Sequence, residues 1–597
     1  MVMKTINDEQ LEKQPMEKNR LFNRKNIRRI NVLQLTIAFA FLLLINVISS
    51  FLFYRVDLTA EKRFTLSKAT REMLKDLDDV VYFKIYLDGD FPAGFKRLQK
   101  ETKEILNEFR AYSDNIQYEF VNPAEGKEKR ELGMFYNQLV KKGLVPTQLQ
   151  NRTADGVETK VIFPAALVTY KNKELPLQLL MNNINMGSED VLNASIQSLE
   201  YNIASVIRKL QTSVKPKIAF IEGHGELEAD QVYSIANDLN TFYDIERIRL
   251  DGQINSLRDM KMDSVSGKVM VKNKYQAIII AKPDSVFTQE DKFIIDQYVM
   301  RGGNILWLVD PVFAQMDSMS SKGETIGIVN ELNLTDMFFR YGVRFNTNLL
   351  QDLNALPIPI MTGKIGNQPR MEMITWFYFP IITPLTNHPI TKNLNSLRTE
   401  FISSMDTVGD PAIKKSVLLT TSRYTKMVNA PMIISLNVLK KKPDKREFGL
   451  NSLPVSILCE GNFTSLFKDR LEGEMDTNKL ISFVSKSEKP SKMVFVSDGD
   501  VIKNQISKDG PLPLGYDKYS QMSFGNKDFI LNVMNYLCGD ETLMQVRARE
   551  VKIRLLDNTK IQRDKFYWQM FNIATPLIII IVMGLLLTFY RKRKYSK

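Results

Sequence analysis

Two uninterrupted apolar stretches, one near each end of the chain, constrain its architecture more than any other feature. Residues 32–54 contain no charged side chain, and residues 570–590 form a second uncharged stretch. A helix of about 20 apolar residues can cross the roughly 30 Å hydrocarbon core of a membrane. The first stretch is too long for the apolar part of a signal peptide, and no small-x-small cleavage site follows it before Arg55. We therefore predict two membrane-spanning helices, the first of which is an uncleaved anchor.

The positive charge of the chain is concentrated beside these stretches. Residues 1–31 carry eight Lys and Arg against four Asp and Glu, and the tail 591–597 carries five Lys and Arg, which accounts for most of the net charge of +13. Cytoplasmic flanks of membrane helices are enriched in Lys and Arg. We therefore predict that both termini are cytoplasmic tails and that the bulk of the chain lies on the other side of the membrane. The same distribution argues against nucleic-acid binding.

Residues 55–212 are predicted to form a membrane-proximal α/β domain. Its expected elements are a collar helix capped by Thr65 or Ser67, strands at 80–87 and 116–123, helices at 95–112 and about 126–142, a hairpin at 163–180 and a closing helix at 195–210. This order, with Pro164 just before the third strand, resembles the thioredoxin fold, in which that proline is cis. Residues 88–92, after the first strand, lack a Cys-x-x-Cys motif, so we expect a binding scaffold without thiol chemistry.

Residues 213–557 are predicted to form a larger α/β domain. Continuous apolar strands alternate with amphipathic helices, which indicates a parallel, doubly wound sheet. The expected strands are 216–222, 244–250, 275–283, 304–311, 452–460 and 491–500, and the expected helices are 229–242, 288–303 and 526–537. Residues 312–450 are mixed, with loop signals at 317–326 and 361–372. Residues 558–569 are assigned to a linker before the second span.

Acidic residues and glycines gather where these strands end. Ligands bind at the carboxyl ends of the strands in a doubly wound sheet. The candidate cleft residues are Glu222, Gly223, His224, Gly225, Glu226, Asp310, Asp498 and Asp500. Such a crevice could hold a sugar, a peptide or a divalent cation, although Asp and Gly are also ordinary turn and N-cap residues. The glycines permit a sharp turn and the glutamates suit a helix N-terminus, so we interpret His224 as a strand–helix turn residue.

The motifs that would carry catalysis are missing. The sequence contains no Walker A motif and no Gly-x-Ser-x-Gly elbow, which excludes the usual nucleotide hydrolases and serine hydrolases. Only His224 and His388 could offer imidazole, so a zinc site would need unusual carboxylate ligation. We predict a protein that is not an enzyme and has no cofactor, with a cryptic metallohydrolase as the weakest alternative. Cys459 and Cys538 lie in apolar contexts that favour buried thiols, and a disulfide between them stays open.

Several sequence stretches together resemble one family, the gliding-motility-associated ABC-transporter component G of gliding bacteria. They are DLTAEKRFTLS at 57–67, FIEGHGEL at 220–227, IDQYVMRGGNILWLVDP at 295–311, RYGVRFNTNLLQDL at 340–353, NHPIT at 387–391, GNFTSLF at 461–467, VSDGD at 496–500 and GNKDFILNVMNYL at 525–537. The resemblance implies an auxiliary subunit of a bacterial inner membrane, often labelled substrate-binding, with the bulk of the chain periplasmic. Such a subunit works with a separate ABC permease subunit and ATPase subunit in surface gliding. Components of the gliding or secretion machinery are further expected partners.

The resemblance also bears on the fold and the site. It implies that the larger domain is similar to a domain of an intraflagellar-transport subunit and to ligand-binding relatives of class I amidotransferases. It provides no catalytic residues that could be assigned to this chain. Two functions therefore stay open: a non-enzymatic subunit that docks a permease, and a module whose strand-end cleft captures a ligand.

Overall fold

The computed structural model divides the chain into two compact units, residues 1–65 and residues 66–597, which are described separately. It describes residues 15–51, 65–126, 128–153, 156–181, 188–211, 215–262, 269–316, 319, 323–365, 368–385, 388–392, 394–440, 443–450, 452–470, 482–508, 510–539 and 558–595.

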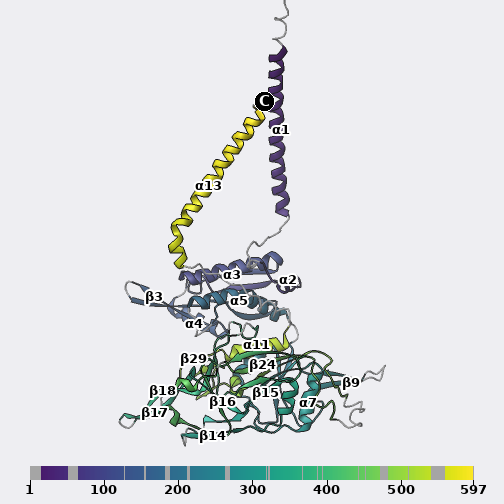
Figure 1. The fold of residues 1–597 in the computed structure, drawn as a ribbon, viewed down its shortest axis with the longest axis vertical. Coiled ribbons are helices and arrows are strands. Elements are labelled where there is room, and N and C mark those ends of the chain that lie inside the picture. Colours follow the sequence, from purple (N-terminus) through teal and green to yellow (C-terminus); the bar gives the residue numbers. More distant parts are fainter. Residues whose placement is uncertain are drawn as a thin grey trace, which may run out of the picture. The chain divides into compact units, whose positions relative to one another are not determined.

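Each of the two apolar stretches lies in one long helix (Figure 1). In the first unit, α1 (Pro15–Phe51) contains the apolar segment Arg29–Val47, and in the second unit α13 (Asn558–Tyr595) contains the segment Arg563–Arg593. Both segments are long and apolar enough to cross a membrane, and none of their residues is buried. Residues 558–569, assigned above to a linker, are the first turns of α13, and residues 52–54 of the first predicted span lie outside the described residues.

The second unit begins with a small α/β domain, whose collar helix α2 (Lys68–Lys75) is capped as expected by Ser67, the hydroxyl of which accepts the Thr70 N–H. A four-stranded sheet has the order β2-β1-β5-β6; β1 is parallel to β2 and antiparallel to β5, and β5 is antiparallel to β6. The elements are β1 (Val81–Ile85), α3 (Ala93–Tyr112), β2 (Ile116–Phe120), α4 (Lys129–Lys141), β5 (Ala165–Tyr170), β6 (Lys173–Gln178) and α5 (Ser188–Gln211).

Buried and half-buried side chains alternate along β1, and the buried ones form part of the core of this domain. Val81, Phe83 and Ile85 are fully buried and pack with apolar side chains of α3 and α5. Two features depart from the prediction. A polar hairpin, β3 (Thr147–Thr153) and β4 (Gly156–Ile162), stands where no strand was predicted, because its sequence lacks apolar alternation. The peptide bond before Pro164 is trans, whereas the thioredoxin resemblance implied cis.

The larger domain is organised around a seven-stranded sheet of order β21-β24-β25-β12-β11-β7-β8. Five strands, from β25 to β8, are parallel, whereas β24 is antiparallel to both β25 and β21. The expected parallel sheet is therefore mixed at one edge. The strands are β7 (Lys217–Glu222), β8 (Asp244–Arg249), β11 (Ala277–Ala281), β12 (Asn304–Leu308), β21 (Lys414–Thr420), β24 (Pro454–Gly461) and β25 (Ser491–Val496).

Helices cover both faces of this sheet, because the central strands are apolar on both sides. On one face, Phe220 and Ile279 pack with α6 (Tyr233–Asn240) and α11 (Asn526–Cys538). On the other face, Ile278 and the fully buried Trp307 pack with α7 (Gln289–Met300) and α9 (Thr335–Tyr341). The predicted helix at 229–242 begins only at Tyr233, after a turn. Cys459 and Cys538 are buried free thiols.

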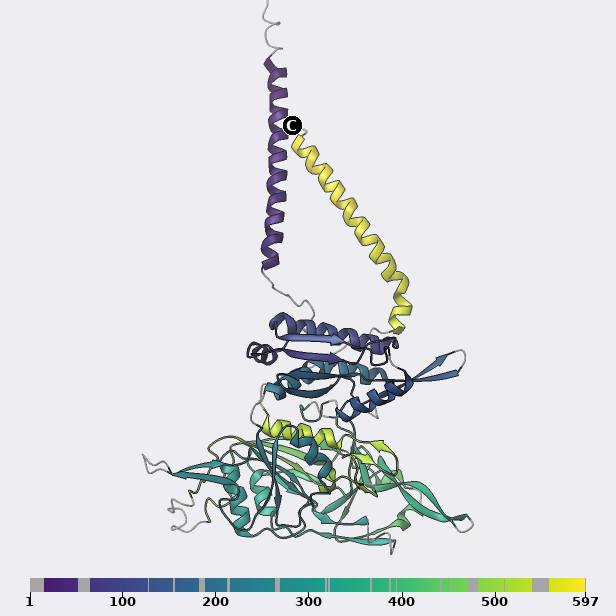
Figure 2. The ribbon, with the colours of Figure 1, turned by 180° about the vertical axis from the view of Figure 1, so that it is seen from behind.

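The region 312–450 is largely β-structure inserted between β12 and β24. Of the predicted loop at 361–372, residues 361–365 and 368–372 belong to a long hairpin of β17 (Ala355–Ile365) and β18 (Gln368–Ile382) that projects from the domain (Figures 1 and 2). Residues 366–367 lie outside the described residues. Of the predicted loop at 317–326, residues 324–326 belong to β14, and residues 317–318 and 320–322 lie outside the described residues. The other elements are β13 (Val312–Phe313), β14 (Glu324–Val329), β15 (Val343–Phe345), β16 (Asn348–Asp352), β19 (Leu397–Arg398), β20 (Met405–Thr407), β22 (Thr425–Asn429), β23 (Met432–Ser435) and short 3-10 turns at 436–440 and 445–447.

Smaller elements complete the domain. The polar insertion at 251–274 contains a second antiparallel pair, β9 (Arg258–Met262) and β10 (Val269–Asn273). After β25 follow a 3-10 turn at 499–502 and the short pairs β26 (Ile506–Ser507) with β27 (Gly510–Pro511) and β28 (Tyr516–Asp517) with β29 (Met522–Ser523).

Candidate ligand cleft at the strand ends

The turn after β7 is made possible by two glycines with left-handed backbone. Gly223 has φ +123° and Gly225 has φ +72°, conformations that side chains with a Cβ rarely adopt. A Cβ on Gly223 would also lie 2.7 Å from the carbonyl oxygen of Leu250, which is backbone and cannot move aside. Glu222 is the last residue of β7, and its side chain contacts Arg247 of the neighbouring strand β8.

His224 is enclosed by this turn. Its ring stacks on Phe287 with centroids 3.7 Å apart, and its Nε2 lies 3.1 Å from the Asp291 carboxylate. Its carbonyl accepts the N–H groups of Asp284 and Ser285. The Glu226 carboxylate accepts the His224 N–H and has its other oxygen 3.4 Å from Nδ1. The imidazole therefore joins β7 to the loop after β11 and to α7.

A lysine holds the next three strand ends together. Lys282 follows β11 directly, and its ammonium lies 3.1 Å from Asp310, which follows β12, and in contact with Asp500, which follows β25. Gly499 is needed beside it, because a Cβ there would lie 2.5 Å from the Lys282 Cβ. Both aspartates were predicted from the sequence, whereas the lysine that pairs with them was not. Its only sequence signal was its place, immediately after the apolar strand Ala277–Ala281.

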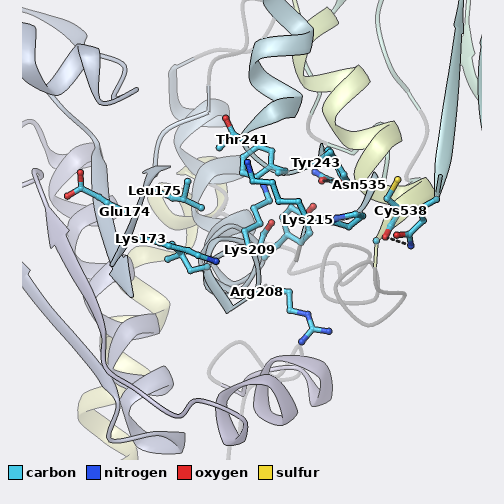
Figure 3. Close-up of a pocket in the computed structure, with 17 residues that line it drawn as sticks. Lys173, Glu174, Leu175, Arg208, Lys209, Lys215, Thr241, Tyr243, Asn535 and Cys538 are labelled. Atoms are coloured by element: carbon cyan, nitrogen blue, oxygen red, sulfur yellow. Dashed lines mark hydrogen bonds between the residues drawn. The ribbon is translucent and has the colours of Figure 1, made fainter. Parts of the chain in front are cut away.

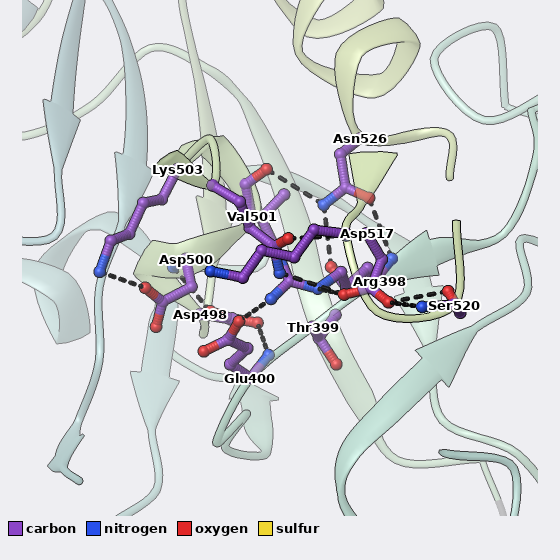
Figure 4. Close-up of polar contacts among 12 residues, drawn as sticks. Arg398, Thr399, Glu400, Asp498, Asp500, Val501, Lys503, Asp517, Ser520 and Asn526 are labelled. Atoms are coloured by element: carbon purple, nitrogen blue, oxygen red, sulfur yellow. Dashed lines mark hydrogen bonds and ion pairs between the residues drawn. The ribbon is translucent and has the colours of Figure 1, made fainter. Parts of the chain in front are cut away.

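The carboxylate of Asp498, two residues before Asp500, binds backbone N–H groups near this ion pair. It is fully buried, and its two oxygens accept the N–H groups of Asp500 and Glu400, both at 2.7 Å. Asp310 in turn accepts the Gly499 N–H at 2.5 Å. The inserted segment around Glu400 is thereby tied to the end of β25 (Figure 4).

The charges in this cluster depend on one another. Burial raises the pKa of Asp310, and burial together with the nearby Asp500 and Asp310 raises the pKa of Asp498 well above its ordinary value. Burial alone would also raise the pKa of Asp500, but Lys282 and Lys503 hold it below the ordinary value. Burial would lower the pKa of Lys282, yet Asp310 and Asp500 raise it well above normal. Lys282 therefore stays protonated, and its positive charge favours the ionised form of Asp500.

A cavity of about 350 Å³ opens above these groups. Of the eight predicted site residues, Gly225, Glu226, Asp310 and Asp500 line it. Asp498 lies below it, and Glu222, Gly223 and His224 are absent from its described lining. Lys282, Glu400 and Lys503 also line it and were not predicted. Glu400 and Lys503 could not be selected from the sequence, because neither ends a predicted strand of the sheet.

The three aspartates could in principle hold a cation. Oxygens of Asp310, Asp498 and Asp500 lie within 4.8 Å of one another, and carboxylates are the usual ligands of Ca²⁺ and Mg²⁺. However, the Lys282 ammonium already contacts two of them. A divalent cation would have to displace it, so these residues fit a metal poorly.

A larger cavity, of about 760 Å³, lies elsewhere. It is lined by parts of α5 and β6, by the segment before β8 and by the end of α11, and its basic residues include Lys173, Lys209 and Lys215 (Figure 3). None of the predicted site residues lines it. We give more weight to the smaller strand-end cleft, because buried charged groups converge there.

Comparison with known proteins gives three further findings. A domain of unknown function matches residues 60–169. An uncharacterized protein of Borreliella burgdorferi (strain ATCC 35210 / DSM 4680 / CIP 102532 / B31) is 21% identical over 575 residues, which cover 94% of this chain and 98% of that protein. A solved structure titled mmIFT52 N-terminal domain is 12% identical, with a TM-score of 0.28, covering 57% of this chain and 100% of that chain.

The remaining comparison concerns the larger domain. A family model described as "ABC-type uncharacterized transport system" matches residues 215–533, more than half of the chain and nearly all of the domain built on the seven-stranded sheet. The match includes β7, where the predicted cleft begins, and every strand-end residue described above. The chain therefore belongs to this family of auxiliary proteins of ABC-type transport systems.

Proposed function

We propose that the chain is a non-catalytic, membrane-anchored auxiliary subunit of an ABC-type transport system for gliding motility. In this proposal α1 and α13 cross the inner membrane and bind a separate permease, a separate ATPase supplies energy, and the region between the helices contacts periplasmic partners. The observation that carries it is the combination of a transport-family domain with two long apolar helices in one chain. The apolar segments of both helices are unburied. The sequence stretches quoted above support the gliding system in particular.

The proposal includes the two domain types. Support for a thioredoxin-like scaffold comes from the order β2-β1-β5-β6 with its one parallel pair, although Pro164 is trans. Support for an amidotransferase-like domain comes from the five parallel strands, with helices on both faces and polar groups at their carboxyl ends. Neither domain brings a catalytic motif with it, which agrees with a binding role.

Co-purification tests this proposal. The tagged full chain is extracted from its own membranes with a mild detergent and isolated by affinity. We expect a multi-span permease and an ATPase to elute with it in constant ratio. A tagged, unrelated two-helix membrane protein extracted in parallel is the control. Recovery of the chain alone, under conditions in which permease and ATPase still elute together, would contradict the proposal.

A second candidate function is ligand binding in the strand-end cleft. It is favoured by the cavity of about 350 Å³ on which Lys282, Asp310 and Asp500 converge. A ligand that binds only the folded chain raises the apparent stability by RT ln(1 + [L]/Kd), about 2.7 kcal/mol at a hundredfold excess over Kd. Thermal unfolding of the full chain with sugars, peptides and divalent cations tests this. The absence of a shift with every class would leave the cleft structural.

A further inference from the structure

A second cavity, of about 660 Å³, adjoins the strand-end cleft, with which it shares Met316, Glu400, Asp500 and Lys503. One side of it is apolar: Ile358 of β17 and Phe379 of β18 are both buried, and Met316 and Ile360 pack with the same cluster. The other side is polar and includes Arg398, Asp517 and Lys518. A volume of this size accepts a small organic molecule or a few amino-acid residues.

Arg398 is a buried cation at this cavity. Its side chain is only 9% exposed, and one of its terminal nitrogens donates to Glu400. Its Nε, however, is buried and has no hydrogen-bond acceptor, and an Asp517 oxygen lies 3.8 Å from it, beyond hydrogen-bonding distance. Both Asp517 oxygens are already used, one by Gln505 and the other by Ser520 (Figure 4). A buried donor without an acceptor is costly unless something else supplies one.

The two lysines at the rim of the cavity also have donor capacity to spare. The Lys503 ammonium lies 3.6 Å from Asp500, beyond hydrogen-bonding distance, and Asp500 is held more closely by Lys282. Within the described part of the chain, no carboxylate lies within 4.0 Å of the Lys518 ammonium, which faces the ring of Tyr519 at 5.2 Å. The Arg398 Nε and the two lysine ammonium groups therefore offer donors with no described carboxylate at hydrogen-bonding distance, and an acceptor with negative charge would satisfy them.

Two features limit what that anion is. Glu400 and Asp517 flank the guanidinium, so a singly charged carboxylate is repelled less than a phosphate. The planar guanidinium also matches a carboxylate in shape. The apolar side of the cavity favours an apolar body attached to the acid, because the surface of that body leaves water when it packs against Ile358 and Phe379.

We propose that this cavity binds a carboxylate carried on an apolar body, with the acid at Arg398 and the body against Ile358 and Phe379. An aliphatic acid and the free C-terminus of a short apolar peptide share this chemistry. The inference does not depend on the permease-docking role, and co-purification is unaffected by its outcome.

Calorimetric titration of the full chain in lipid nanodiscs tests the inference. The probes are octanoate against 1-octanol, and N-acetyl-Leu-Leu with a free acid against the same dipeptide as its amide. Empty nanodiscs correct for partition into lipid. We expect at least one acid to bind at least tenfold more tightly than its neutral partner. Preference for octanoate identifies an aliphatic acid, and preference for the dipeptide acid identifies a peptide.

Variants connect binding to this cavity. Lys503→Met and Lys518→Met are at the rim, and we expect each to weaken acid binding three- to tenfold, whereas Lys508→Met, exposed and outside the lining, leaves it unchanged. Arg398→Lys keeps the charge but loses the planar fork, and we expect a loss of more than tenfold in a variant whose unfolding temperature is retained. Equal binding of acids and neutral partners, no binding of any probe, or equal effects of the three methionine variants would overturn the inference.

Discussion

At the scale of single residues, Lys282 is the centre of the strand-end cleft. It follows β11 with φ +55° and connects the ends of β11, β12 and β25 through its contacts with Asp310 and Asp500. This role cannot be predicted from the local sequence, because the partners of Lys282 are 28 and 218 residues away. A lysine after an apolar strand is ordinarily interpreted as a solvated end, and only the fold brings both aspartates to it.

Replacing this lysine should destabilise the larger domain. Lys282→Met keeps the length of the side chain but leaves Asp310 and Asp500 without their counter-ion. Removing one partner of a buried pair costs about 3–5 kcal/mol; because the Lys282 side chain is 21% exposed, we expect about 2–3 kcal/mol, measured as a lower unfolding temperature of the full chain. Lys503→Met, at a half-buried position where the ammonium lies 3.6 Å from Asp500, should change stability by less than about 0.5 kcal/mol. Equal unfolding temperatures for both variants would show that the pair contributes no stability.

The buried Asp498 makes a pH-dependent contribution of its own. Burial and the nearby Asp500 and Asp310 raise the pKa of Asp498 in the folded chain. The folded chain then binds a proton more tightly than the unfolded chain, so its stability rises as the pH falls through the raised pKa toward the ordinary value of 3.8. In Asp498→Asn this position no longer titrates.

We therefore expect the wild-type chain to gain more thermal stability than Asp498→Asn between pH 8 and pH 5. Asparagine keeps only one acceptor for the two N–H groups of Asp500 and Glu400, so the variant is also less stable at every pH, by about 1–2 kcal/mol. The measurement is the difference in slope of unfolding temperature against pH. Parallel slopes would mean that Asp498 has an ordinary pKa in the folded chain.

At the scale of elements, prediction succeeded where a sequence pattern determines structure locally. The apolar runs of β7, β11, β12 and β25 and the Ser67 cap of α2 lie where the residues placed them. The β17–β18 hairpin was missed because the sequence at 361–372 contains Gly363, Gly366, Asn367 and Pro369, residue types that favour turns and loops in isolation. Whether such a segment forms a strand depends on its cross-strand neighbours, which a local sequence pattern does not reveal.

The two apolar helices carry the next prediction. An arginine at the centre of a spanning helix costs roughly 2.5–3.5 kcal/mol of insertion free energy. We expect Leu43→Arg in α1 and Ile580→Arg in α13 each to reduce the amount of full chain recovered in membranes and bound to the permease. Asn31→Arg and Gln569→Arg place the same residue beside the apolar stretches, where it reaches the interface, and serve as matched controls. Normal recovery of both central variants would show that neither helix is inserted.

At the scale of the whole molecule, the inserted region 312–450 completes the site. The backbone N–H of Glu400 donates to Asp498 at the end of β25, and the Arg398 side chain lines the adjoining cavity. One segment of the insertion therefore contributes to both cavities. The sequence predicted the strand-end aspartates, since Asp after an apolar strand is a local signal. It could not predict Arg398 or Glu400, since their place depends on how the insertion folds back over the sheet.

The last prediction concerns which side of the membrane this domain occupies. If α1 and α13 both span the membrane with their basic flanks in the cytoplasm, then the region between them is entirely periplasmic. Protease added to spheroplasts should then remove residues of the central region from every molecule, leaving membrane fragments that contain α1 and α13, detected with tags at the two termini. Intact cells, in which the protease is excluded, and lysed spheroplasts, in which both tags are also digested, are the controls. Full-length chain surviving in spheroplasts in which a known periplasmic protein is digested would place the central region in the cytoplasm, and the proposed contact with periplasmic partners would be wrong.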